Sequence, residues 1–120
     1  MDELRGKKAT AAYSPEQGHS VVIYTCKFKP QHFREGVKKV TEDFPKAQSK
    51  GSQKRLNLFL TRPHTHEIVN VSFFDKGPDD RVHLWHESKG RRKTVNELQE
   101  MLEKPIDVQV FEVADVVGIS

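Results

Sequence analysis

The chain of 120 residues is poor in cysteine, tryptophan and tyrosine, and it lacks long apolar runs. Its single cysteine, Cys26, cannot form an internal disulfide, which favours a reducing compartment, so we expect the protein in the cytoplasm. No apolar run approaches the ~18 residues that a membrane helix needs, and no apolar segment follows Lys7 and Lys8 to form a signal peptide. The sequence therefore argues against a secreted, disulfide-stabilised domain and predicts no membrane partner.

A strong excess of charge of one sign is also missing. Twenty basic and 17 acidic residues are interspersed along the chain and leave a net charge of +3. Nucleic-acid-binding proteins typically carry a denser basic patch, often with interleaved aromatic residues. The basic run at residues 89–93 contains no aromatic residue and is typical of a solvated loop. We therefore expect no nucleic-acid partner.

Apolar residues are few, and they are unevenly distributed. Hydrophobic residues make up 35% of the chain, yet residues 1–19 contain a single member of the Leu, Ile, Val and Phe group, Leu4. Gly6, Pro15 and Gly18 interrupt the same segment. This pattern predicts a loose N-terminal arm over residues 1–19 and one folded domain over residues 20–120.

Four segments have the composition and alternation of β-strands. They are SVVIYTCKF (20–28), RLNLFLT (55–61), EIVNVSFF (67–74) and IDVQVFEV (106–113). A short turn that begins at Pro63 joins the second segment to the third, which predicts an antiparallel hairpin.

Two helices are predicted between these strands. The first runs from Pro30 to Pro45, with Phe33, Val37, Val40 and Phe44 on one helical face, and Gly36 would allow close packing there. The second begins at a capping box formed by Thr94 and Glu97 and ends at Pro105, with Val95, Leu98, Met101 and Leu102 on its apolar face. Residues 80–87 (DRVHLWHE) fit a helix or an alternating strand, and so short a run leaves both open.

The resulting element order, strand–helix–strand–strand–helix–strand, is that of a ferredoxin-like α+β fold with an antiparallel sheet. This order, the opening VVIYTCKFKP, the central hairpin, Trp85 near the second helical region and the closing VQVFEV resemble the dimeric α+β barrel superfamily. The resemblance is closest to its antibiotic-biosynthesis-monooxygenase-like branch and spans about residues 20–113. It implies a homodimer in which two four-stranded sheets face each other and close a barrel with ligand pockets on the inner faces.

The same resemblance bears on activity, because the superfamily includes cofactor-independent monooxygenases, haem-degrading enzymes and proteins of no known activity. The haem-degrading type relies on an Asn in the first strand, a Trp at the end of the third strand and a His in the second helix. Here the first strand contains no Asn, the third strand ends in Phe73 and Phe74, and Trp85 and His86 come later. These departures argue against haem degradation, and we expect no cofactor.

The two faces of the predicted sheet differ in composition. One face is uniformly apolar and is predicted to lie beneath the helices: Leu56, Leu58, Leu60, Val69, Val71, Phe73, Ile106, Val108 and Val110. The other face mixes aromatic residues with amides and hydroxyls, including Asn57, Phe59, Asn70, Ser72, Phe74, Gln109 and Phe111. A mixed lining suits a small-molecule cavity, in which aromatic walls give affinity and a few polar groups fix orientation. A partly hydrated dimer interface or a plain solvent face stays open as the alternative.

The cavity reading assigns a role to each side chain. Asn57, Asn70 and Gln109 would orient a ligand with Ser72 beside them, Phe59, Phe74, Phe111 and Trp85 would form the walls, and Tyr24 would join them from the first strand. A histidine, His86 first and His83 second, would act as the general base, because an imidazole titrates near neutral pH. His64 and His66, like His83 and His86, lack the third ligand and the spacing of a metal site, so we expect no metal.

Three hypotheses follow from the sequence. The first is a homodimeric α+β barrel that binds a small apolar or aromatic molecule, with the resemblance implying a cofactor-independent monooxygenase. The second is a non-catalytic binding or structural module of the same fold that uses the mixed face only for dimerisation. The third is a basic module that contacts RNA through residues 89–93, which would give steep salt dependence.

Overall fold

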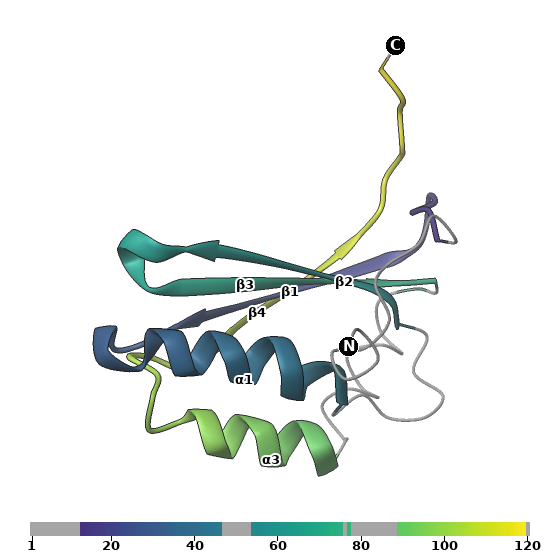
Figure 1. The fold of residues 1–120 in the computed structure, drawn as a ribbon. Coiled ribbons are helices and arrows are strands. Elements are labelled where there is room, and N and C mark those ends of the chain that lie inside the picture. The colour runs from purple at the N-terminus through teal and green to yellow at the C-terminus, as the bar shows by residue number, and fades with distance from the viewer. Residues whose placement is uncertain (1–12, 47–53, 76, 78–88, 120) are drawn as a thin grey trace, which may run out of the picture.

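The computed structural model of the protein describes residues 13–46, 54–75, 77 and 89–119. Its elements follow the predicted order and are β1 (Ser20–Lys27), α1 (Phe33–Lys46), β2 (Lys54–Arg62), β3 (Glu67–Phe74), α3 (Lys89–Leu98) and β4 (Asp107–Glu112). The four strands form one sheet in the order β2-β3-β1-β4, and each neighbouring pair is antiparallel. Figure 1 shows α1 and α3 on one side of the sheet, and none of the described residues forms a helix on the other side. The ferredoxin-like α+β fold and the β2–β3 hairpin are thus confirmed.

Proline and glycine set the position of α1. Pro30 opens a short 3-10 turn that leads directly into the helix, as expected for a residue whose fixed φ suits the first helical position. Gly36 faces the ring of Phe28, and a Cβ built on Gly36 would overlap three carbon atoms of that ring. The predicted close packing is confirmed. Because glycine has no side chain, the backbone of α1 can lie against the ring of Phe28, the residue that follows β1.

The second helix differs from its prediction at both ends. The structure describes α3 over Lys89–Leu98, so Thr94 lies within the helix and does not cap it. Lysine and arginine are good helix formers, and the basic run that we expected in a loop is part of α3. Met101 and Leu102 follow in a turn, and both are buried against the sheet. The apolar spacing was therefore correct, whereas the start signal was wrong.

The side of the sheet that the helices cover is the main correction to the sequence analysis. Val22, Tyr24, Asn70, Ser72 and Phe74 are each at most 1% exposed. The register places these residues on one face, since Tyr24 is opposite Asn70 and Val22 is opposite Ser72. Leu58 and Leu60 lie on the other face and are 45% and 49% exposed. The helices thus cover the mixed face of β2 and β3, and the uniformly apolar face is open.

Strand β4 follows the prediction. Val108 is opposite Tyr24, and Ile106 and Val108 pack against the buried core, as expected of residues beneath the helices. Alternation along a strand shows which residues share a face, but it contains no information about which face a helix covers. The prediction was therefore right within each strand and wrong in the choice of face for β2 and β3.

Some of the predictions concern residues that the structure does not describe. The alternative between helix and strand at residues 80–87 lies outside the described residues, as do Trp85, His83 and His86. The described residues contain no helix that is long and apolar enough to cross a membrane.

Candidate functional site

A polar cluster lies beneath the helices at the centre of the sheet. It consists of Asn57 on β2 and Asn70 and Ser72 on β3. Asn70 is 1% exposed and Ser72 is fully buried, whereas Asn57 is half-buried at the edge strand. The two buried members need hydrogen-bond partners, because a buried polar group without one costs roughly 1–3 kcal/mol.

The three side chains bond to one another. Asn70 Nδ2 donates to Asn57 Oδ1 at 3.2 Å, and Ser72 Oγ lies 2.9 Å from Asn70 Oδ1 and 3.0 Å from Asn57 Oδ1. The serine hydroxyl has one proton and cannot donate to both oxygens. If it donates to Asn70, a chain of hydrogen bonds runs from Ser72 through Asn70 to Asn57, and each amide oxygen accepts one bond. The two N–H groups of Asn57 then form the outer end of the chain.

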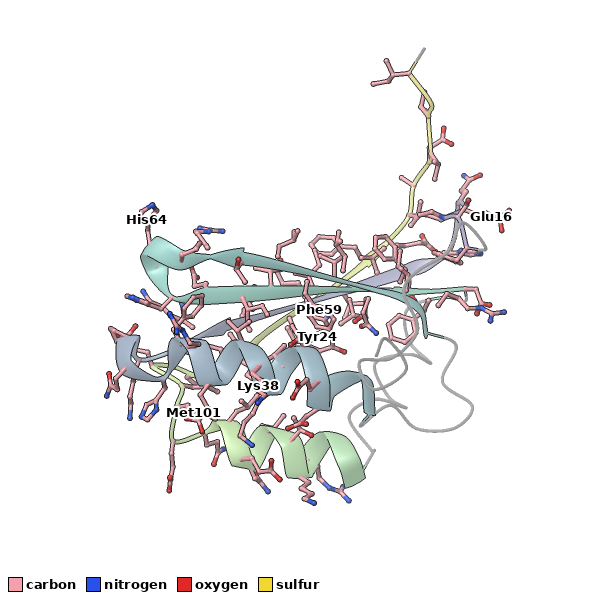
Figure 2. All side chains as sticks on the ribbon, viewed as in Figure 1. Glu16, Tyr24, Lys38, Phe59, His64 and Met101 are labelled. Carbon is pink, nitrogen blue, oxygen red and sulfur yellow. The ribbon has the colours of Figure 1, made fainter. Side chains whose placement is uncertain are left out.

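Aromatic side chains surround this cluster. The register places Phe59 opposite Asn70 on β2 and Tyr24 opposite Asn70 on β1. Figure 2 shows Tyr24 and Phe59 between the sheet and α1. Phe74 is buried on the same face, next to the start of β1. The hydroxyl of Ser20, opposite Phe74, is buried and has no hydrogen-bond partner among the described residues.

The structure thus brings together most of the predicted lining and separates the rest. Asn57, Phe59, Asn70, Ser72, Phe74 and Tyr24 share the covered face. Gln109 and Phe111 lie on the open face, because they are opposite Ile23 and Val21. Their inclusion in the same lining was wrong, and the reason is one of phase: β4 presents its valines to the helices, so its amide and phenylalanine point away.

A second candidate site lies at the rim of the open face. A cavity of about 750 Å³ is lined by Tyr13, Ser14, Glu16, His19, Arg55 and Asp75. The ring of Tyr13 stacks on His19 with centroids 5.9 Å apart and lies 6.3 Å from Phe73 of the open face. Backbone bonds hold the segment in place, since Gly18 donates to Val113 at 2.9 Å and Val113 donates to His19 at 2.7 Å.

The protonation state of Tyr13 in this rim cavity follows from the groups around it. Burial raises the pKa of Tyr13, and the carboxylates of Asp75 and Glu16 raise it further. The phenol is therefore neutral at pH 7, and its oxygen lies 3.1 Å from His19 Nδ1 in a hydrogen bond whose donor is set by the tautomer of His19. The opposite ring nitrogen of His19 lies 3.6 Å from a carboxylate oxygen of Glu16. A phenol, an imidazole and a carboxylate thus follow one another along the cavity wall.

Asp75 forms the other wall of the rim cavity. Arg55 Nε donates to Asp75 Oδ2 at 2.7 Å, and this hydrogen bond lowers the pKa of Asp75. The second oxygen of Asp75 is buried and has no hydrogen-bond partner among the described residues. This site was not predicted, because residues 1–19 have the composition of a loose arm; the pairing of Gly18 and His19 with Val113 brings the segment to the sheet.

The described residues contain no group of three or more His, Cys, Asp or Glu side chains that could hold a metal ion. His64 lies at the exposed tip of the β2–β3 hairpin, and His66 takes a left-handed backbone conformation (φ 59°) where the hairpin returns. In the part of the chain that the structure describes, both histidines thus belong to the turn between β2 and β3.

Comparison with known proteins gives a likeness in structure but none in sequence. No protein-family model and no curated protein sequence matches the chain. A candidate antibiotic biosynthesis monooxygenase from Deinococcus radiodurans superposes with a TM-score of 0.69 at 10% identity, over 84% of this chain and 98% of that one. Rv0793 from Mycobacterium tuberculosis gives 0.68 at 13% identity, over 84% of this chain and 100% of that one.

A candidate antibiotic biosynthesis monooxygenase from Bordetella bronchiseptica gives a TM-score of 0.67 at 12% identity, over 81% of this chain and 98% of that one. The TM-scores establish a shared fold, whereas identities this low leave the activity open. The resemblance drawn from the element order is confirmed at this level. The chain has the ferredoxin-like α+β fold of the antibiotic-biosynthesis-monooxygenase-like proteins.

Proposed function

We propose that the chain is one subunit of a homodimeric α+β barrel that binds a small aromatic molecule between its sheet and its helices and oxygenates it without a cofactor. The observation that carries this proposal is the polar cluster of Asn57, Asn70 and Ser72 among aromatic side chains on the covered face. A polar group costs free energy in a core that serves only stability, whereas a binding site needs a few polar groups among apolar walls.

The hydrogen-bond chain indicates what the ligand offers. The inner members, Ser72 and Asn70, bond to each other and to Asn57. The amide N–H groups of the half-buried Asn57 have no hydrogen-bond partner among the described residues and would donate to an oxygen of the ligand. A carbonyl or phenolic oxygen on an aromatic ring satisfies both the donors of Asn57 and the aromatic surfaces of Tyr24 and Phe59.

The proposed reaction uses the substrate as the source of electrons. A hydroxylated aromatic or its keto form loses a proton, and the resulting anion transfers electrons to dioxygen. One oxygen atom enters the product and the other leaves as water, so a ring CH2 becomes C=O. The amide of Asn57 would stabilise the negative oxygen of the anion, as preorganised donors do in other enzymes. His86 and His83, which lie outside the described residues, stay the predicted proton acceptors.

The second hypothesis, a non-catalytic module, requires a different face for its dimer interface. The second hypothesis used the mixed face for dimerisation, but the helices cover that face in β2 and β3. A non-catalytic module would therefore bind its ligand at the same cluster, and the two hypotheses differ only in turnover of the ligand.

The experiment compares the wild-type protein with a triple variant, Asn57→Leu, Asn70→Leu and Ser72→Ala. Anthrone and 1-naphthol serve as probes, with affinity measured by fluorescence quenching and turnover by oxygen consumption. Because all three bonding partners are removed together, the free energy of unfolding should stay within about 1 kcal/mol of wild type. Anthrone affinity should fall at least tenfold, and oxygen consumption should be lost.

Asn96→Leu provides the matched control, because it removes an exposed amide from α3. It should leave affinity and oxygen consumption unchanged. Equal anthrone affinity in wild type and triple variant would exclude the cluster as the binding site. Binding without oxygen consumption would support the binding-only module and overturn the oxygenase.

The dimer is proposed on the open face of the sheet. Leu58, Leu60 and Phe111 are 45–49% exposed there, and Leu56, Val71 and Phe73 are half-buried beside them. A contiguous apolar face of this kind marks an interaction site. Sedimentation velocity of the full chain should give a dimer at micromolar concentration, and a monomer at all concentrations up to 0.5 mM would contradict it.

A further inference from the structure

The rim cavity shares no lining residue with the ligand site proposed above. Its volume is about 750 Å³, and its lining comes from residues 13–19, from the start of β2 and from Asp75, which follows β3. Figure 2 shows Glu16 at one end of the sheet and His64, on the tip of the β2–β3 hairpin, at the other. Small-molecule sites have volumes of about 300–1,000 Å³, so the rim cavity is large enough for a ligand of its own.

A backbone turn fixes the wall that residues 13–19 form. His19 N donates to Glu16 O at 3.1 Å, and Gly18 has a φ of 89°, which is typical of the third residue of a type II turn. Backbone bonds join Gly18 and His19 to Val113, and the ring of Tyr13 stacks on His19. The side chains of this wall are therefore held in place by contacts within the chain.

Arg55 supplies the hydrogen-bond donors of the opposite wall. A guanidinium group has five N–H donors, and Asp75 accepts the one on Nε at 2.7 Å. The terminal N–H groups of Arg55 have no partner among the described residues, and the side chain is 58% exposed. Two parallel N–H groups of this kind match the two oxygens of a carboxylate. Arg55 is thus positioned by one carboxylate and can still bind a second.

Glu16 supplies the acceptor. Its carboxylate is 76% exposed and lies 3.6 Å from His19 Nε2, which is too long for a good hydrogen bond. Asp75 offers less to a ligand, because Arg55 holds Oδ2 and Oδ1 is buried. Burial and the carboxylates of Asp75 and Glu16 raise the pKa of Tyr13, whereas Arg55 lowers it. Charges of both signs therefore act on the phenol in the middle of the cavity.

We propose that the rim cavity binds a small zwitterion, an amino acid or a dipeptide, with its carboxylate on Arg55 and its ammonium group on Glu16. An anion without an ammonium group meets Glu16 unpaired, and a cation without a carboxylate meets the free donors of Arg55. Only a ligand with both charges gains at both ends. The rings of Tyr13 and Phe73, 6.3 Å apart, add an aromatic surface for an apolar side chain of the ligand.

The experiment compares ligands that differ by one charge. L-phenylalanine and L-phenylalanylglycine are titrated into the 15N-labelled full chain at low ionic strength, beside 3-phenylpropanoate, which lacks the ammonium group, and 2-phenylethylamine, which lacks the carboxylate. At least one zwitterion should bind with a millimolar Kd and shift the amides of residues 13–19. Each single-charge analogue should bind about fivefold more weakly, or by about 1 kcal/mol, because an exposed ion pair is weak.

Two variants assign the two ends of the ligand. Arg55→Gln should weaken the zwitterion and 3-phenylpropanoate about fivefold and leave 2-phenylethylamine unchanged, and Glu16→Gln should do so for the zwitterion and 2-phenylethylamine only. Arg92→Gln and Glu100→Gln, which remove exposed charges elsewhere, are the matched controls and should bind as wild type does. Far-UV circular dichroism checks that each variant is folded.

Three results would overturn the zwitterion site. They are the absence of binding by both zwitterions, an analogue that binds as tightly as the better zwitterion, and amide shifts that leave residues 13–19 unchanged. The triple variant of the covered face should bind the zwitterion as wild type does, because the two sites share no lining residue. Failure of the oxygenase proposal would therefore leave this inference intact, and the reverse also holds.

Discussion

The burial of the two sheet faces is the reverse of what their composition predicts, because the mixed face is covered and the apolar face is exposed in β2 and β3. The face beneath the helices contains Ser20, Asn70 and Ser72, all at most 1% exposed, whereas the face open to solvent contains a row of leucines. A sheet that had to satisfy only one subunit would have the reverse arrangement, because burial of leucine stabilises a fold by about 1.5–3 kcal/mol. The proposed function accounts for this difference by a ligand bound at the covered face and a second copy of the chain against the open face.

The largest expected effect is on the open face. Leu58→Glu places a carboxylate among the apolar side chains of the open face, within the proposed interface. The dimer Kd should rise at least 1000-fold, about 4 kcal/mol, because each uncompensated buried charge costs several kcal/mol. Sedimentation equilibrium measures the change, and Gln99→Glu, at an exposed turn position just after α3, is the control. A variant dimer as tight as wild type would place the interface elsewhere.

The next prediction compares the loss of stability when an aliphatic side chain is truncated to alanine on each face of the sheet. In the Leu58→Glu background, Ile68→Ala should lower the free energy of unfolding by about 2–5 kcal/mol, since Ile68 is 1% exposed beneath the helices. Leu60→Ala, at a half-exposed position of the open face, should lower it by less than about 1 kcal/mol. Urea denaturation measures both, and equal losses would contradict the assignment of faces.

Gly36→Ala tests the contact that seats α1 on the covered face. Alanine gains up to about 1 kcal/mol of helix propensity, but its methyl group overlaps the ring of Phe28. Overpacking costs about 1–3 kcal/mol, so the variant should be less stable by about 1–2 kcal/mol. Gly77→Ala, where a Cβ meets no atom, is the control in thermal denaturation. A variant more stable than wild type would show that the helix can move off the ring.

The smallest expected effect concerns acid at the rim of the open face. The hydrogen bond from Arg55 lowers the pKa of Asp75, so this pair stabilises the fold above about pH 4, and its contribution is lost as the pH falls further. Arg55→Gln should move the acid-unfolding midpoint to higher pH by a few tenths of a unit. Arg55 is more than half exposed, so salt should reduce the difference. Circular dichroism follows the titration, with exposed Arg92→Gln as control; identical midpoints would contradict the role of the pair.

Local pattern was a good guide wherever the answer depended on neighbours in the sequence. β3 was predicted at its observed bounds, and the hairpin after Pro63 formed as expected. The capping box at Thr94 failed because two matching residues are weak evidence, and the basic residues before them are themselves good helix formers. Six of the proposed lining residues share one face because they follow one another at alternate positions or across the register.

The order of the elements, the antiparallel hairpin and the sets of residues that share a face within a strand followed from the amino-acid pattern, because these depend on periodicity and on turn chemistry within short segments. Three outcomes could be seen only in the folded chain: which face the helices cover, the separation of Gln109 and Phe111 from Asn57, and the cavity that residues 13–19 line with Arg55 and Asp75. Those outcomes depend on which surfaces α1 and α3 meet and on pairing between distant segments such as Gly18 and Val113. Alternation along a strand shows which residues share a face, whereas the packing of the helices decides which of the two faces is buried.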